Sequence, residues 1–125
     1  AGAPGVTAIA VITTVGTRDE ARRLGRTLVE RRLAACAQVS EIESCYVWDG
    51  VLRDEPEFRL VLKTTDACYA ALEQAICELH PYELPAIHAL AFAQIHAPYA
   101  AWIEANSGGD DRTEASGDGS RLAPR

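Results

Sequence analysis

The segment His80-Pro81-Tyr82-Glu83 brings together three side chains that could bind a ligand or a metal ion. An imidazole, a phenol and a carboxylate follow one another where a predicted helix ends, and Pro81 and Pro85 stiffen the chain around them. One interpretation is a ligand or metal pocket that includes His80, Tyr82 and Glu83. The alternative is a helix C-cap followed by a rigid turn that docks against a neighbouring subunit.

Two further side chains, Lys63 and Trp48, are candidates for the same pocket. Lys63 is the only lysine of the chain, and it comes just before Thr64 and Thr65, where a second helix is expected to begin. A cation beside a helix N-terminus could hold an anion, and Lys63 could equally pair with Glu83 or another carboxylate. Trp48 comes directly before a predicted hairpin turn, where it either lines the pocket or packs at a subunit interface.

The remaining motifs do not indicate an enzyme. The chain has no glycine-rich phosphate-binding loop and no recognisable nucleophile motif. Acid–base chemistry by His80 with Tyr82 and Glu83 is the enzymatic alternative, but we expect a non-catalytic protein. His88 and His96 share one face of a predicted strand and lie about 26 Å apart, because a strand rises ~3.3 Å per residue. One metal ion cannot bridge them, since metal–nitrogen bonds are about 2 Å long.

Size and charge narrow the range of partners. The chain has 125 residues, enough for one domain. Its net charge of -6 and pI of about 5.0 disfavour nucleic acid and membrane surfaces, because an acidic surface repels phosphates. The four cysteines show no C-x-x-C spacing, so we expect reduced, mostly buried thiols. No apolar run approaches the ~20 residues of a membrane span and the N-terminal residues do not resemble a signal peptide, so we expect a cytoplasmic protein. The cysteines are Cys36, Cys45, Cys68 and Cys77.

The hydrophobic pattern predicts four strands. They span residues 7–15, 36–48, a segment that includes 58–63, and 86–96. Asp49-Gly50 predicts a type I′ hairpin turn between the second strand and the third.

Three helices are predicted between and after the strands. The first begins at a capping box of Thr17 and Glu20, the second at a cap formed by Thr65 or Asp66, and the third at Pro98. Their apolar stripes are Ala21, Leu24, Leu28 and Val29; Tyr69, Leu72, Ile76 and Leu79; and Tyr99, Trp102 and Ile103.

The order β-α-β-β-α-β followed by a short C-terminal helix predicts an α+β, ferredoxin-like split βαβ sandwich. Both helices should cover one face of an antiparallel sheet. The last strand also carries Leu90 and Phe92 on its other side, so we expect sheet-to-sheet oligomerisation to cover the open face. Residues 7–106 form this domain, residues 1–6 a flexible N-terminus, and residues 107–125 a disordered tail rich in Gly, Ser and charge.

Four motifs in register resemble the CutA family of divalent-cation tolerance proteins. They are Leu33-Ala34-Ala35-Cys36, Tyr46-Val47-Trp48-Asp49-Gly50, Leu62-Lys63-Thr64 and His80-Pro81-Tyr82-Glu83-Leu84-Pro85. The resemblance covers residues 8–106. It implies a tight cytoplasmic homotrimer shaped like the PII signalling proteins, a link to metal tolerance with copper binding in some members, and no established catalytic activity.

The resemblance also implies limits on metal binding. In some CutA proteins, copper is linked to a Cys near the end of the first strand and to a His-His pair that closes the second helix. This chain has Val15 and Leu79 where those proteins have the Cys and the first His, and Ala86 where a Glu is frequent. Only His80 remains, so we expect weak binding of copper(II) or another divalent cation there.

The alternative function is a PII-like trimeric module that binds a small molecule or anion, or another protein. The side chains expected in its pocket are Trp48, Lys63, His80, Tyr82 and Glu83.

Overall fold

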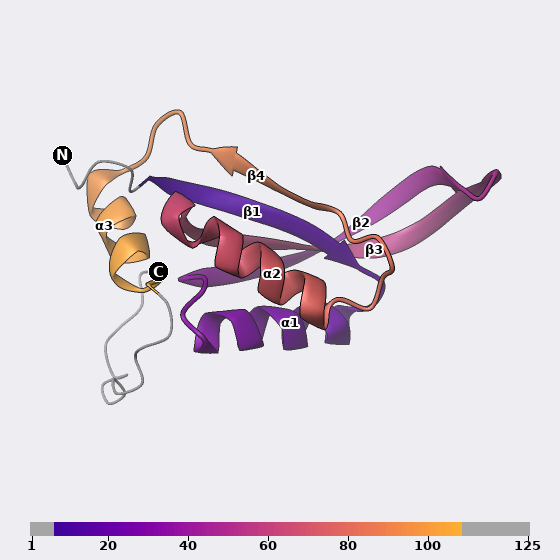
Figure 1. Ribbon diagram of the computed structural model, residues 1–125. Coiled ribbons are helices and arrows are strands. Elements are labelled where there is room, and N and C mark those ends of the chain that lie inside the picture. The colour runs from indigo at the N-terminus through magenta and orange to yellow at the C-terminus, as the bar shows by residue number, and fades with distance from the viewer. Residues whose placement is uncertain (1–6, 109–125) are drawn as a thin grey trace.

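The chain folds around one antiparallel sheet with the strand order β2-β3-β1-β4 (Figure 1). The structure is a computed structural model that describes residues 7–108. The strands are β1 (Ala8–Val15), β2 (Cys36–Trp48), β3 (Val51–Thr65) and β4 (Ile87–Ala91). The predicted flexible N-terminus and residues 109–125 of the predicted tail lie outside the described residues.

Helices α1 (Arg18–Glu30) and α2 (Tyr69–Leu79) cover the same face of the sheet, and α3 (Ala97–Ala105) lies at its end (Figure 1). A 3₁₀ turn, Asp66–Cys68, precedes α2. The element order and the one-sided placement of α1 and α2 confirm the predicted ferredoxin-like, α+β fold.

The two predicted helix caps have different outcomes. The Thr17 capping box is confirmed, because the backbone N–H of Glu20 donates to Thr17 Oγ1 at 3.0 Å. Thr65 is the N-cap residue of the 3₁₀ turn that leads into α2, as predicted, but its side chain makes no cap bond. Asp66 Oδ1 instead accepts a hydrogen bond from the backbone N–H of Thr7 at 3.0 Å. The Asp66 carboxylate therefore holds the start of β1 in place.

The hydrophobic core lies between the sheet and the two helices that cover it. Its largest fully buried side chains on the strands and on α1 and α2 are Val11, Val15, Leu60, Leu62, Leu28, Leu72 and Ile76. Leu79, predicted to join the apolar stripe of α2, is 42% exposed, and Ala75 is buried on that helix instead. The helix ends at this point, so Leu79 extends beyond the sheet-facing stripe.

Strand β4 is shorter than predicted. It ends at Ala91, which pairs with Ile9, and its partner β1 begins only one residue before Ile9. Pairing therefore stops, and the chain turns towards α3. His96 is the N-cap residue of α3, so the expectation that His88 and His96 share a strand face is wrong.

The chain remains packed beyond the end of α3. Ser107, where the disordered tail was expected to begin, is buried, and its Oγ donates to the carbonyl of Ile103 at 2.6 Å. The Cys68 thiol donates to the Ser107 carbonyl at 3.2 Å. The packed region thus includes Ser107.

All four cysteines are free thiols. Cys36 and Cys68 are half-buried, whereas Cys45 and Cys77 are exposed, so the expectation of mostly buried thiols is wrong for the latter pair. Cys45 lies near the hairpin end of β2, and Cys77 lies on the outer side of α2.

The hairpin of β2 and β3 is the longest feature of the fold. The two strands pair without interruption from Cys36 opposite Lys63 to Trp48 opposite Val51. Asp49 and Gly50 both have positive φ, 54° and 75°, as a type I′ turn requires. Strand β1 pairs only with residues 58–65 of β3, so residues 42–57 form an arm that projects beyond the sheet (Figure 1).

We expect Leu60→Ala to lower the free energy of unfolding by about 2–5 kcal/mol, because Leu60 is fully buried and the cavity left behind would not close. Chemical denaturation measures the change. Leu79→Ala is the matched control, since it removes the same atoms from a partly exposed site and should cost well under half as much. Equal losses in both variants would contradict this placement of the core.

Candidate functional site

A pocket of about 490 Å³ opens on the face of the sheet that carries no helix, where the arm meets residues 80–86. It is lined by Thr14, Tyr46, Trp48, Arg53, Glu55, Glu57, Tyr82, Glu83, Leu84 and Ala86. The pocket residues on β2 and on β3 are every second residue of each strand, and Tyr46 pairs directly with Arg53 across the two strands. Because side chains on a strand alternate between faces, one face of the arm forms one wall of the pocket.

Glu57 lies in the floor of this pocket and is only 8% exposed. Its Oε1 accepts a hydrogen bond of 2.7 Å from Ser44 Oγ, and its Oε2 accepts one of 2.9 Å from the Tyr82 hydroxyl. Burial, the hydrogen bond to Glu57 and the charge of Glu57 raise the pKa of the Tyr82 phenol above its ordinary value. Tyr82 therefore keeps its proton and acts as a hydrogen-bond donor.

His80 lies beneath the pocket and orients the segment that carries Tyr82. The backbone N–H of Tyr82 donates to His80 Nδ1 at 3.1 Å. Nδ1 is therefore the acceptor nitrogen, so Nε2 carries the hydrogen and donates to the Thr14 carbonyl at 2.8 Å. The imidazole also contacts the Tyr82 ring edge-on, with 4.8 Å between ring centroids. His80 is buried, and both of its ring nitrogens are used within the chain.

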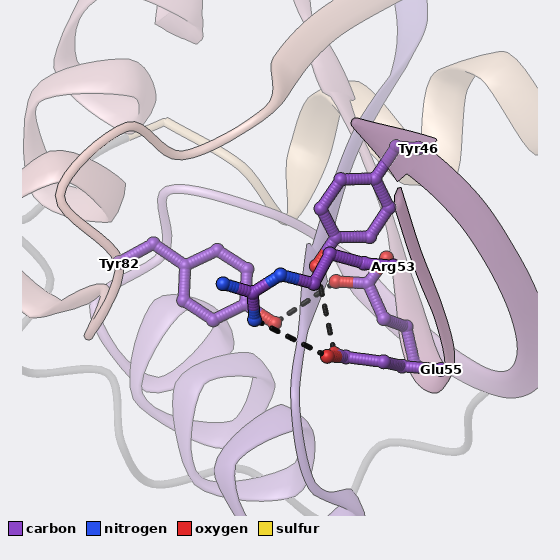
Figure 2. Close-up of polar contacts among 5 residues, drawn as sticks. Tyr46, Arg53, Glu55 and Tyr82 are labelled. Carbon is purple, nitrogen blue, oxygen red and sulfur yellow. Dashed lines mark hydrogen bonds and ion pairs between the residues drawn. The ribbon is translucent and has the colours of Figure 1, made fainter. Parts of the chain in front are cut away.

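The outer rim of the pocket is held by weaker, exposed contacts. The Tyr46 hydroxyl donates to Glu55 Oε1 at 3.5 Å, and Arg53 Nη1 lies 3.8 Å from Glu55 Oε2. Figure 2 shows Tyr46 and Arg53 converging on Glu55 from the arm, while Tyr82 reaches in from the opposite segment. Exposed contacts of these lengths contribute little to stability, so the rim can rearrange around a ligand.

Lys63 lies away from the pocket. Its Nζ donates to the Tyr99 hydroxyl at 3.1 Å and sits 5.3 Å from the centroid of that ring. Within residues 7–108 it forms no ion pair with Glu83 or with another carboxylate. The structure therefore brings Trp48, Tyr82 and Glu83 together, places His80 beneath them, and separates Lys63 from all four.

Sequence reasoning missed the contribution of the arm. Tyr46, Arg53, Glu55 and Glu57 line the pocket, but none was predicted as a site residue. Their spacing could have indicated the site. Arg53, Glu55 and Glu57 are every second residue after the predicted hairpin turn, so their side chains lie on one face of the strand. Nothing in the sequence indicates that Glu57 is buried, because the hydrogen-bond donors to its carboxylate lie far from it along the chain.

The donor set does not fit a tight metal site. Across the described residues, no group of three His, Cys, Asp or Glu side chains could hold a metal ion. Val15 is fully buried in the core and Leu79 has no donor atom. His80 could bind a metal only by breaking one of its two hydrogen bonds.

Comparison with known proteins identifies the family. Residues 9–106 match the CutA1 divalent ion tolerance protein family. The chain belongs to this family. The divalent-cation tolerance protein CutA of Thermus thermophilus is 37% identical over 99 residues, which cover 78% of this chain and 96% of that protein. The probable divalent-cation tolerance protein cutA homolog of Encephalitozoon cuniculi is 38% identical over 106 residues, or 85% and 91% of the two chains.

Solved CutA structures share the fold. The CutA structure from Synechococcus elongatus superimposes with a TM-score of 0.79 at 34% identity, covering 83% of this chain and 92% of that one. A CutA from Archaeoglobus fulgidus, described as periplasmic, gives a TM-score of 0.79 at 25% identity, covering 82% of this chain and 100% of that one. Within residues 7–108 of the present chain, no helix is long and apolar enough to cross a membrane.

We expect Tyr82→Phe to destabilise the protein by about 1–3 kcal/mol, because it removes one of the two donors to the buried Glu57 carboxylate. Chemical denaturation at pH 7 measures the loss. Tyr69→Phe is the control, since the Tyr69 hydroxyl makes only a 3.5 Å contact with Glu73 near the surface of α2. Equal effects of the two substitutions would show that the contact with Glu57 is not stabilising.

The same variant should change the response to high pH. The pKa of Tyr82 is raised in the folded protein, so above about pH 10 the unfolded chain loses this proton while the folded chain keeps it. The stabilising contribution of Tyr82 is therefore complete below pH 10 and is lost as the pH rises further. Stability should decline less steeply above pH 10 in Tyr82→Phe than in the parent.

Proposed function

We propose that this protein acts in divalent-cation tolerance as a non-catalytic, cytoplasmic homotrimer. The observation that carries the proposal is the family match over residues 9–106, nearly the whole folded domain. The four free thiols support a reducing compartment, because disulfides form mainly in oxidising ones. The proposal for this chain rests on family membership.

Exposed apolar side chains support the trimer. On the arm, Val47 and Leu52 pair across the two strands and are 65% and 67% exposed. Leu90 is 53% exposed on the open face of the sheet. Strands β2 and β4 are the two edges of the sheet, and edge strands are usually covered or paired. Packing of these three side chains against further copies would remove them from water.

Copper(II) binding is proposed to be weak and to involve His80. Tight sites bring three or four donor atoms to one point. His80 is the one imidazole in the expected position, and its two nitrogens already hold the Tyr82 backbone and the Thr14 carbonyl. A metal would therefore compete with the packing of residues 80–86.

A second candidate function is a PII-like module that binds a small molecule. The pocket supports it, since about 490 Å³ lies within the usual range for ligand sites of ~300–1,000 Å³. Trp48, Tyr82 and Glu83 line this pocket, as expected for such a module. A protein-interaction role would use the same exposed arm.

We expect the protein at micromolar concentration to have about three times the monomer mass of 13.5 kDa by light scattering. Leu52→Asp should lower that mass, because it places a charge on the exposed apolar side of the arm. Arg22→Asp on the outer side of α1 is the control and should leave the mass unchanged. A monomeric parent would refute the trimer.

Isothermal titration of copper(II) into the tag-free protein should give a dissociation constant no tighter than about micromolar, as expected for fewer than three donors. His80→Ala should weaken any saturable binding, while a double variant His88→Ala, His96→Ala should not. Nanomolar affinity in the parent would contradict the weak site, and unchanged binding by His80→Ala would remove His80 from it.

A further inference from the structure

Glu57 is a buried carboxylate that has no cationic partner in the part of the chain that the structure describes. Within residues 7–108 the ion pairs are Arg18–Glu41 and Arg53–Glu55, and Glu57 belongs to neither. Only two neutral hydroxyls, from Ser44 and Tyr82, hydrogen-bond to it. Buried charges in proteins are normally paired with an opposite charge or a metal, because desolvation of an isolated charge is costly. No cation among residues 7–108 therefore offsets the Glu57 charge, and a cationic ligand would supply the missing partner.

The Glu57 carboxylate can still receive such a partner. Each of its oxygens accepts one hydrogen bond within the chain, and a carboxylate offers about four acceptor positions. Glu57 lines the pocket despite its low exposure, so its remaining acceptor positions are reachable from the pocket interior. An N–H donor entering the pocket would find an acceptor at its floor.

The walls of the pocket favour an organic cation over a bare metal ion. Tyr46, Trp48 and Tyr82 contribute three aromatic rings, each 37–40% exposed. Aromatic faces attract ammonium and guanidinium groups through the ring quadrupole. Leu84 and Ala86 add apolar surface that suits a hydrocarbon body and offers nothing to a hydrated ion.

The charges around the pocket disfavour an anion. Three carboxylates line it, from Glu55, Glu57 and Glu83, against the single guanidinium of Arg53. Arg53 lies 3.8 Å from Glu55, so these two charges offset each other and two negative charges remain. Lys63, the one side chain expected to attract an anion, is engaged with Tyr99.

We propose that this pocket binds a small organic cation, an ammonium or guanidinium group on an apolar body. The charged group bonds to Glu57 at the floor, and the body stacks between the rings of Tyr46, Trp48 and Tyr82. This inference rests on the second proposed function, the small-molecule module, and specifies the charge and class of its ligand. It is independent of the role in cation tolerance and of the weak copper site at His80.

The test is isothermal titration of the full chain with four matched probes. Benzylamine and phenylguanidine carry the cation on an aromatic body, benzyl alcohol is the neutral control, and benzoate is the anionic control. We expect saturable binding of the two cations and none of benzoate. Glu57→Gln, which keeps the shape and removes the charge, should weaken cation binding by about tenfold or more. Glu43→Gln should not, because Glu43 is exposed and lies on the other face of β2.

A second variant tests the same pocket in case Glu57→Gln does not fold. Tyr46 is partly exposed, so Tyr46→Leu should fold normally, remove one ring and weaken benzylamine binding by about threefold. Equal binding of benzylamine and benzyl alcohol, or full affinity in Glu57→Gln, would overturn the proposal. So would a fall in oligomer mass in Glu57→Gln, because the carboxylate would then receive a cationic side chain of another copy. The copper titration and the parent mass test the copper site and the trimer separately from this proposal.

Discussion

Glu57 connects two parts of the chain that are far apart in sequence. Its carboxylate accepts hydrogen bonds from Ser44 on β2 and from Tyr82, which follows α2. Because the charge is buried, both donors have to remain in place, and the loss of either leaves the carboxylate under-satisfied. His80 adds a second attachment by bonding to Thr14 on β1. The contacts of Tyr82 with Glu57 and of His80 with Thr14 hold residues 80–86 against the sheet, and the Ser44 bond fixes the Glu57 carboxylate that receives Tyr82.

The arm formed by residues 42–57 has two consequences for function. It extends past the end of β1, so it supplies a wall of the pocket without being covered by a helix (Figure 1). It also exposes Val47 and Leu52, which a single copy of the chain cannot bury. Ligand binding and subunit assembly thus involve the same structural element, and a change in one is expected to affect the other.

The parts of the fold that were predicted correctly depend on neighbouring residues. The Thr17–Glu20 cap and the Asp49-Gly50 turn are short-range features, in which the interacting groups are at most three residues apart. The errors concern tertiary context. β4 stops at Ala91 because its partner β1 begins at Ala8, and Asp66 binds the backbone of Thr7 instead of capping a helix. The composition of a segment contains no information about where its pairing partner begins.

Motif spacing was enough to predict the element order, the family and the segment with His80, Tyr82 and Glu83 that borders the pocket. The roles of these side chains follow from contacts that the folded chain makes. Folding turned His80 inwards beneath the pocket, paired Lys63 with Tyr99 at another part of the sheet, and buried Glu57 under Tyr82. Periodicity and motif spacing report which groups are available along the chain. Whether a group faces solvent, a ligand or a distant donor depends on contacts between segments dozens of residues apart, which form only when the sheet assembles.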